Sequence, residues 1–217
     1  MPSIEENPFL ADKLRLIMKL RKEGITDTRV LSAIENTPRE MFIPDRYRGK
    51  AYHDTAIPIE REQTISQPTV VAWMTSALNV HDRCRVLEVG TGSGYQAAIL
   101  ARLARRVYTI ERHKELMKVA EERFKKQNLS NITTRLGDGA KGWPEASPFD
   151  RIIVTAAAPS VPAGLLEQLA VGGVMIIPVG DLQGEQILLR LARDKDGFSS
   201  QHLMHVRFVP LIEGKTP

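Results

Sequence analysis

Residues Val86–Tyr95 read Val-Leu-Glu-Val-Gly-Thr-Gly-Ser-Gly-Tyr, an apolar run followed at once by three alternating glycines, Gly90, Gly92 and Gly94. Glycines at a turn from a strand into a helix permit positive φ and let the backbone approach a ligand closely. The free N–H groups of the following helix then point toward that ligand. The segment therefore predicts a nucleotide-cofactor loop inside an α/β fold.

The spacing of the glycines separates two classes of cofactor. A dinucleotide site reads G-x-G-x-x-G, whereas this loop reads G-x-G-x-G and continues with Tyr95. Glu88 precedes the first glycine by two residues, and a carboxylate facing the ligand there would repel a pyrophosphate. A cationic cofactor without phosphate suits it better, and the pattern resembles motif I of S-adenosylmethionine-dependent methyltransferases. The loop residues expected to hold S-adenosylmethionine are Glu88, Gly90, Thr91, Gly92, Ser93 and Gly94.

Two further acidic residues follow the loop at the expected intervals. Glu111 ends a β-branched run about twenty residues later, where a carboxylate can accept both ribose hydroxyls. Asp138 stands between Gly137 and Gly139 at the end of the next expected strand, the adenine-contacting position in this superfamily. Either acid alone is more typical of a solvated strand end or turn. Because both acids follow the glycine loop at the expected intervals, we expect Glu111, Asp138 and Gly139 to bind the cofactor.

Composition limits the class of protein. The chain has 217 residues, 42% of them hydrophobic, which fits one domain with a full core. The net charge is +4, but basic and acidic residues are interspersed, so binding to nucleic acid is permitted and not indicated. A lone cysteine, Cys84, favours a reducing compartment, and five scattered histidines predict no metal site. Without an export signal or a membrane-length apolar run, we expect a cytoplasmic protein with no membrane partner.

Hydrophobic periodicity predicts a doubly wound, Rossmann-like α/β sheet, mostly parallel, with antiparallel C-terminal strands and added N-terminal helices. Residues 1–67 would supply those helices and a substrate-side loop, and residues 68–217 the cofactor-binding core of the same domain. The stretch 38–67 is irregular and too long for a mere connection. The expected helices span 8–23, 27–36, 68–78, 95–104, 114–127 and 163–169. The expected strands span 85–89, 107–110, 132–136, 149–155, 173–178, 187–191 and 205–209.

Taken together, these motifs resemble the protein-L-isoaspartate O-methyltransferases in their bacterial form. The most specific parts are Thr64-Ile65-Ser66-Gln67-Pro68 and Val209-Pro210-Leu211, and the likeness covers nearly the whole chain. It implies transfer of a methyl group from S-adenosylmethionine to the free α-carboxylate of L-isoaspartyl residues in damaged proteins and peptides. The cofactor product would be S-adenosyl-L-homocysteine, and the ester would start repair through a succinimide. We expect a monomeric enzyme.

The resemblance also assigns the substrate side of the site. The family has a serine or threonine at the active site in this segment, which corresponds to Ser66, expected to orient the incoming carboxylate. Ser66 also precedes a predicted helix, so capping that helix is an alternative role. The expected substrate contacts, through backbone groups offered to an extended peptide, are Ile65, Ser66, Val209, Pro210 and Leu211; an ordinary apolar edge is the alternative.

One departure from the family concerns the residues on either side of Arg61. The family usually has glycine at both positions, whereas this chain has Glu60 and Glu62. Two acidic side chains near the entrance for a carboxylate substrate predict slower turnover of acidic peptides.

Two other functions remain open. A tRNA or other nucleic-acid methyltransferase would share the fold, but the chain lacks an Asn/Asp-Pro-Pro-Tyr/Phe segment, and Cys84 lacks the Pro-Cys setting of a cytosine-C5 nucleophile. A non-catalytic module that binds S-adenosylmethionine is suggested by Glu60 and Glu62, although the presence of Ser66 argues against it.

Overall fold

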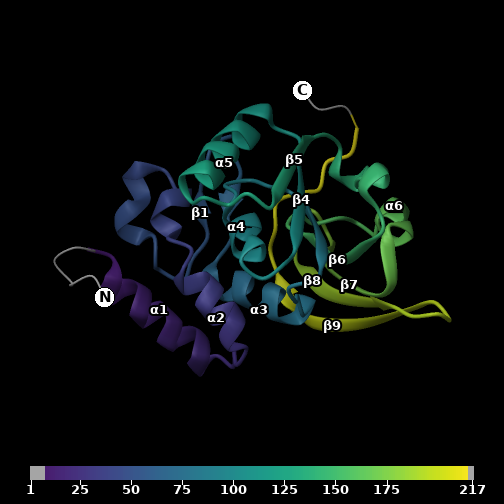
Figure 1. The fold of residues 1–217 in the computed structure, drawn as a ribbon, viewed down its shortest axis with the longest axis horizontal. Helices are drawn as coiled ribbons and strands as arrows, with labels where there is room; N and C mark the ends of the chain where they lie inside the picture. The colour runs from purple at the N-terminus through teal and green to yellow at the C-terminus, as the bar shows by residue number, and fades with distance from the viewer. Residues whose placement is uncertain (1–7, 215–217) are drawn as a thin grey trace.

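The structure is a computed structural model that describes residues 8–214. Three helices lie before the glycine loop: α1 (Leu10–Lys22), α2 (Thr28–Glu35) and α3 (Pro68–Leu78), as the sequence predicted. Asp27 caps α2 by accepting the backbone N–H groups of Arg29 and Val30. Proline is tolerated as the first residue of α3 because that position has no intrahelical N–H bond. Figure 1 shows α1 and α2 at the lower left, with α3 between α2 and the main sheet.

The connection between α2 and α3 contains short elements that periodicity could not reveal. It holds two 3-10 helices, η1 (Arg39–Phe42) and η2 (Asp45–Lys50). A small antiparallel hairpin follows, made of β1 (Ile57–Pro58) and β2 (Thr64–Ile65). The hairpin leads directly into α3, so it carries Ser66 to the start of that helix.

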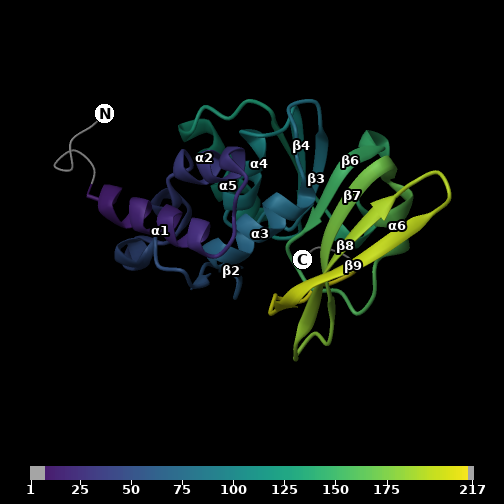
Figure 2. The same cartoon turned by 90° about the horizontal axis from the view of Figure 1, so that it is seen from below.

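The main sheet confirms the predicted fold class. Its strands are β3 (Arg85–Val89), β4 (Arg106–Glu111), β5 (Ile132–Leu136), β6 (Phe149–Val154), β7 (Leu169–Gly180), β8 (Gln186–Arg193) and β9 (Phe198–Val206). They lie in the order β5-β4-β3-β6-β7-β8-β9. The first five are parallel, and β8 and β9 join antiparallel. Figure 2 shows β8 and β9 as a long two-stranded ribbon at the lower right, at one edge of the sheet.

Helices and loops cover both faces of the sheet. On one face α3 packs against β6 and β7, α4 (Tyr95–Ala101) against β4, and α5 (Lys114–Lys126) against β4 and β5. That core is continuous with the buried side chains of α1 and α2. On the other face, α6 (Ala163–Glu167) and the segment with Trp143 cover a second cluster. No helix within residues 8–214 is long and apolar enough to cross a bilayer.

Several predicted boundaries were wrong. The last strand is 198–206, not 205–209. The Phe208 N–H leaves the ladder and donates to the Gln186 side chain, which sends the chain toward the cofactor side. The fifth parallel strand begins at Leu169 rather than at residue 173, because an irregularity in β6 lets Phe149 pair with Leu169. Helix α6 therefore ends at Glu167 rather than at residue 169. Helix α4 ends at Ala101 rather than at residue 104.

The tip of the small hairpin is strained. Arg61 and Glu62 have φ of 59° and 56°, and the Gln63 N–H donates to the Glu60 carbonyl. Two central residues with positive φ make a type I′ turn, which glycine or asparagine normally occupies. The two glutamates noted in the sequence thus include one in a left-handed conformation, which costs an L-residue about 1–2 kcal/mol.

Restoring glycine at position 62 is therefore expected to stabilise the protein. We expect Glu62→Gly to raise the free energy of unfolding by about 1 kcal/mol, measured by urea denaturation. Glu62→Ala is the matched control, because it removes the same carboxylate and keeps the strained conformation. Equal stabilisation by the two variants would assign the effect to charge rather than to φ.

Candidate functional site

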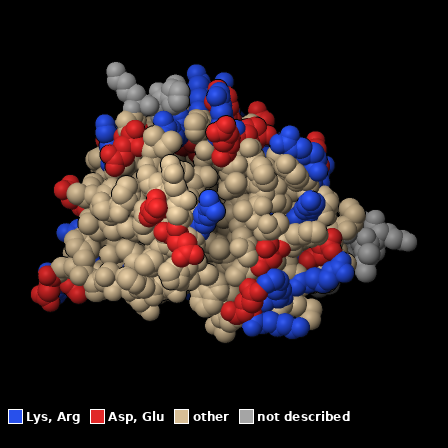
Figure 3. All heavy atoms as spheres, turned by 180° about the vertical axis from the view of Figure 1, so that it is seen from behind, with Lys and Arg blue, Asp and Glu red and all other residues tan. Residues whose placement is uncertain are grey.

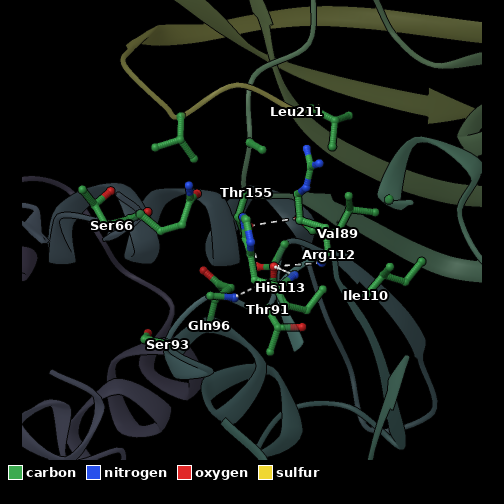
Figure 4. Close-up of a pocket in the computed structure, with 18 of the residues that line it drawn as sticks. Ser66, Val89, Thr91, Ser93, Gln96, Ile110, Arg112, His113, Thr155 and Leu211 are labelled. Atoms are coloured by element: carbon green, nitrogen blue, oxygen red, sulfur yellow. Dashed lines mark hydrogen bonds between the residues drawn. The ribbon is translucent and has the colours of Figure 1, made fainter. Parts of the chain in front are cut away.

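The candidate site lies where the strand order reverses. β4 and β5 lie on one side of β3, and β6 and β7 lie on the other, so the loops that follow β3 and β6 diverge. Thr155 ties these loops together at their start, since its hydroxyl donates to the Gly90 carbonyl at 2.7 Å. A cavity opens at this edge of the sheet, as Figure 4 shows.

Four segments far apart in the sequence line this cavity. They are the hairpin exit, the glycine loop, the end of β4 and the C-terminal segment; the lining includes residues 63–66, 89–93, 110–113 and 209–212, with Gly137, Gly139 and Thr155. In Figure 4, Ser66 lies at the far side of the cavity from Ile110 and Leu211. Most of the predicted site residues thus come together here, on both the cofactor and the substrate side: Ile65, Ser66, Gly90, Thr91, Gly92, Ser93, Glu111, Gly139, Val209, Pro210 and Leu211.

The glycine loop requires glycine at two places for different reasons. Gly90 has φ of 97°, and a Cβ there would lie 2.4 Å from the Thr155 hydroxyl. Gly94 has φ of 87°, and a Cβ there would lie 2.8 Å from the ring of Phe124 on α5. The first glycine brings the β3 and β6 loops together, and the third lets α4 pack on α5. The turn can be built only because both side chains are absent.

Glu111 holds the loop to the end of β4. One carboxylate oxygen accepts the Gly92 N–H at 2.8 Å, and the other accepts the N–H groups of Arg112 and His113 at 2.8 and 2.9 Å. These three bonds fix the carboxylate at the cavity wall, where it is 5% exposed. Its predicted role toward ribose hydroxyls remains a prediction.

Glu88 does not face the cavity, and that expectation was wrong. Val86 contributes to the core under α4 and Leu87 to the opposite core, so the pleat turns Glu88 toward the α4 face. Its carboxylate is fully buried and accepts the hydroxyl of Thr109. Burial raises the pKa of Glu88 to about 8, and the bond from Thr109 partly opposes that rise. Thr109 in turn meets the hydroxyl of Thr91 at 2.6 Å, which links Glu88 to the cavity wall indirectly.

Two other predicted cofactor residues lie outside the cavity lining, Gly94 and Asp138. Asp138 uses both carboxylate oxygens on backbone groups, accepting the N–H of Ala140 at 3.0 Å and that of Gly214 at 2.9 Å. It therefore caps the 3-10 turn η3 (Gly139–Lys141) and tethers the C-terminal segment. Contact with an adenine ring remains a prediction for Asp138.

Ser66 does not cap α3, so the alternative role weighed from the sequence was wrong. The N-cap of α3 is Gln67, which makes no capping bond, and Asp54 accepts the Thr69 N–H in its place at 2.9 Å. No side-chain hydrogen bond engages the Ser66 hydroxyl within residues 8–214, while its carbonyl accepts a bond from Arg39 at 2.8 Å. The hydroxyl is therefore available at the cavity, on a segment fixed from behind.

The C-terminal segment is already paired on one side. The Val209 carbonyl accepts the Ala157 N–H at 2.8 Å, and the Leu211 N–H donates to the Ala157 carbonyl at 2.7 Å. Alternate groups of an extended segment point to opposite sides, so the Pro210 carbonyl is the group left for a peptide. For the predicted pairing with an extended peptide, this segment therefore offers one backbone acceptor, the Pro210 carbonyl.

Sequence reasoning missed several residues of this region, among them Arg39, Arg112 and Thr155. Thr155 follows β6 at the switch point, so its position after a predicted strand was a usable signal. Arg112 lines the cavity and donates to the Ile212 carbonyl at 3.3 Å. Arg39 lies beneath Ser66 in a turn with no periodic pattern, and nothing in the sequence marked it.

The donor set fits S-adenosylmethionine. At Gly92 an added Cβ would meet only Ile59, at 3.9 Å, so there is room for a ligand to approach the middle of the loop closely. The Glu111 carboxylate suits hydroxyl groups, and Val89, Ile110 and Leu211 supply apolar walls suited to an aromatic base.

Comparisons with known proteins agree with this geometry. A sequence model described as Protein-L-isoaspartate(D-aspartate) O-methyltransferase matches residues 11–216. The protein-L-isoaspartate O-methyltransferase of Parvibaculum lavamentivorans is 58% identical over 94% of this chain and 92% of its own. That of Rhodospirillum centenum is 57% identical over 95% and 94%.

Solved structures give the same answer. A protein-L-isoaspartate O-methyltransferase superposes with a TM-score of 0.84 and 28% identity, over 94% of this chain and 67% of that one. A putative protein-L-isoaspartate O-methyltransferase from Plasmodium falciparum, in complex with S-adenosyl-L-homocysteine, superposes with a TM-score of 0.81 and 27% identity over 92% and 98%. The chain therefore belongs to the protein-L-isoaspartate(D-aspartate) O-methyltransferase family.

Proposed function

We propose that this protein methylates the free α-carboxylate of L-isoaspartyl residues in damaged proteins and peptides, with S-adenosylmethionine as methyl donor. The ester would then close to a succinimide, which can reopen as aspartate. One observation carries the proposal: the free hydroxyl of Ser66 and the glycine loop line one cavity. Relatives named protein-L-isoaspartate O-methyltransferase match nearly the whole chain.

The reaction asks little of the protein beyond positioning. S-adenosylmethionine, when bound, supplies a methyl group on a positively charged sulfur that leaves as a neutral thioether. A carboxylate with a pKa near 4 is already an anion at pH 7, so no residue has to remove a proton. Holding the two reacting atoms in line at about 3–3.5 Å is then the main contribution to rate.

We assign the two sides of the cavity to the two substrates. The loop Gly90–Ser93 with Glu111 and Gly139 holds the cofactor, supported indirectly by Glu88, Gly94 and Asp138. Ser66 donates its hydroxyl to one oxygen of the α-carboxylate. Ile65, Val209 and Leu211 pack along the peptide, and the Pro210 carbonyl accepts a peptide N–H.

Transfer of a labelled methyl group tests this function. The substrates to compare are an isoaspartyl peptide, the same peptide with ordinary aspartate, and unmodified tRNA. Label in the isoaspartyl peptide alone, released as methanol in mild base, would support the proposal. Label only in tRNA would favour a nucleic-acid methyltransferase. Figure 3 shows no large patch of basic side chains on the face opposite to that of Figure 1, where acidic and basic side chains are intermixed. Cofactor binding without any transfer would favour a binding module.

Removal of the Ser66 hydroxyl is expected to slow transfer without weakening cofactor binding. A hydrogen bond to a charged group contributes about 1.5–3 kcal/mol, so Ser66→Ala should lower kcat/KM by about 10- to 100-fold. Ser66→Thr keeps the hydroxyl and should retain most activity. Calorimetric affinity for S-adenosyl-L-homocysteine should stay the same in both variants. Full activity in Ser66→Ala would remove Ser66 from the mechanism.

A further inference from the structure

Arg39 lies directly behind the Ser66 segment. Its side chain is 0% exposed and comes from η1, between the N-terminal helices and the hairpin. One guanidinium nitrogen donates to the Ser66 carbonyl at 2.8 Å, and the guanidinium carbon lies 4.8 Å from the centre of the Tyr95 ring. Ser66 and Tyr95 both line the cavity, so Arg39 contacts two of its wall residues from the buried side.

The charge of Arg39 has no partner of opposite sign in direct contact. Within residues 8–214 no carboxylate oxygen lies within 4.0 Å of it, and its Nε and Nη1 atoms are buried without a hydrogen bond. Asp54 attracts the guanidinium without touching it, since its carboxylate pairs with Lys19 at 2.9 Å, and Glu40 accepts the Tyr52 hydroxyl. Burial lowers the pKa of Arg39, but a guanidinium remains charged in proteins.

Holding the Ser66 carbonyl does not explain this arrangement. A neutral donor such as glutamine could make the same hydrogen bond without burying a charge. An unpaired buried charge destabilises a folded protein. Replacing buried charged groups by apolar side chains of similar size is often neutral or stabilising. Among the residues that the structure describes, the positive charge lacks a carboxylate in direct contact, and an anion brought to the Ser66 hydroxyl would add a second negative charge near it across a low-dielectric wall.

We propose that Arg39 is a positioning residue that fixes the Ser66 backbone and selects the anionic α-carboxylate of the substrate through its buried positive charge. This inference rests on the proposed function. The carboxylate binds the Ser66 hydroxyl on the cavity side while Arg39 holds the carbonyl of the same residue from the other side. Arg39 touches neither reacting atom, so its effect falls on substrate selection and leaves cofactor binding unchanged.

Charge selection can be measured as a ratio of affinities. The probes are an isoaspartyl peptide with blocked termini and its counterpart in which the α-carboxylate is an amide, each titrated calorimetrically into protein saturated with S-adenosyl-L-homocysteine. The variants are Arg39→Met, Arg39→Gln, which keeps a donor without charge, and Arg39→Lys, which keeps the charge. We expect the preference for the carboxylate to fall about tenfold or more in Arg39→Met and Arg39→Gln, and to be largely kept in Arg39→Lys.

Arg102 offers a matched control in the same part of the fold. Unlike Arg39, Arg102 is exposed at the surface, but partial burial lowers its pKa as well, and its Nε donates to the Thr37 hydroxyl at 3.0 Å. Arg102 does not line the cavity. Arg102→Met should lower stability and leave the preference for the carboxylate at the wild-type value.

The outcomes separate this inference from the proposed function. Wild-type preference in Arg39→Gln, or an equal loss in Arg102→Met, would overturn the role of Arg39 while leaving the methyltransferase assignment intact. If the wild-type protein neither prefers the carboxylate peptide nor methylates it, the proposed function fails, and the role of Arg39 fails with it. An affinity for S-adenosyl-L-homocysteine unchanged within about twofold shows that each variant is folded.

Discussion

Alanine in place of Gly90 is expected to abolish measurable binding of S-adenosyl-L-homocysteine and to lower the free energy of unfolding by about 3 kcal/mol. Two causes combine. A φ of 97° is unfavourable for any L-residue, and the new Cβ would lie 2.4 Å from the Thr155 hydroxyl. The single proton of that hydroxyl is shared between the carbonyls of Gly90 and Val89, at 2.7 and 3.0 Å, so the hydroxyl cannot move away without losing this bond. The loops after β3 and β6 would have to separate.

A double variant divides these causes. Thr155→Ala removes the clashing oxygen and leaves the backbone strain, so Gly90→Ala with Thr155→Ala should recover part of the stability lost in Gly90→Ala. The difference, read from a double-mutant cycle by urea denaturation, is the contribution of the clash. Gly49→Ala is the control, because Gly49 is exposed and an added Cβ there would meet nothing within 4 Å.

Tight cofactor binding by Gly90→Ala would mean that the loop does not need its observed path. The cofactor would then have to be held elsewhere along the cavity, and the role proposed for residues 90–93 would be wrong. Loss of stability with full affinity would assign Gly90 to the fold alone.

The sheet could be predicted because its signals are local. The glycine loop marks the end of β3, and apolar runs separated by helical periods mark the parallel strands that follow. The C-terminal boundaries failed for a non-local reason. Phe208 belongs to an apolar run, but its N–H bonds the side chain of Gln186, which only the folded hairpin brings near.

The direction of Glu88 could not be read from the motif. A strand residue faces one side or the other according to register, and both sides of β3 are covered. The motif placed an acid beside the loop correctly and assigned its carboxylate to the wrong face. Glu111, at the end of β4, was placed correctly because strand ends converge on the cavity whatever their register.

The substrate side was predictable only through the family resemblance. Ser66, Pro210 and the glycine loop are far apart in the sequence, and no periodicity links them. Arg39 shows the complementary limit. A lone arginine in a Pro-Arg-Glu turn looks like a surface residue, and only the packing of η1 against Tyr95 makes it a buried charge.

Glutamine in place of Glu88 is expected to stabilise the protein at neutral and alkaline pH. Burial raises the pKa of the folded-state carboxyl to about 8, above its ordinary value of 4.5. The folded protein thus keeps a proton that the unfolded chain releases, so the stability contributed by this group is fully present below about pH 4.5 and is lost as pH rises toward 8. Each pH unit in that window costs about 1.4 kcal/mol per proton.

Glu88→Gln has no proton to lose, and its amide oxygen can still accept the Thr109 hydroxyl. We expect the free energy of unfolding at pH 7.5 to rise by about 2 kcal/mol, reduced from the full linkage value because the new amide N–H groups need acceptors in the core. At pH 5 the gain should be gone and the variant should be about 1 kcal/mol less stable than the wild type, because about 3 kcal/mol of linkage separates the two pH values. Urea denaturation across pH 5–8.5 measures both effects, with the exposed Glu122→Gln as the control for the same chemical change at the surface.

The pH dependence decides what Glu88 does. A parallel pH profile in wild type and Glu88→Gln would mean that the carboxylate is ionised in the folded state, stabilised by the N-terminus of α4 or by a bound cation. Loss of affinity for S-adenosyl-L-homocysteine in Glu88→Gln would mean that Glu88 binds the cofactor, as the sequence predicted. If instead affinity is kept and only the pH slope changes, Glu88 acts through the buried chain of Thr109 and Thr91, and the loop owes its cofactor contacts to Glu111 and its own backbone.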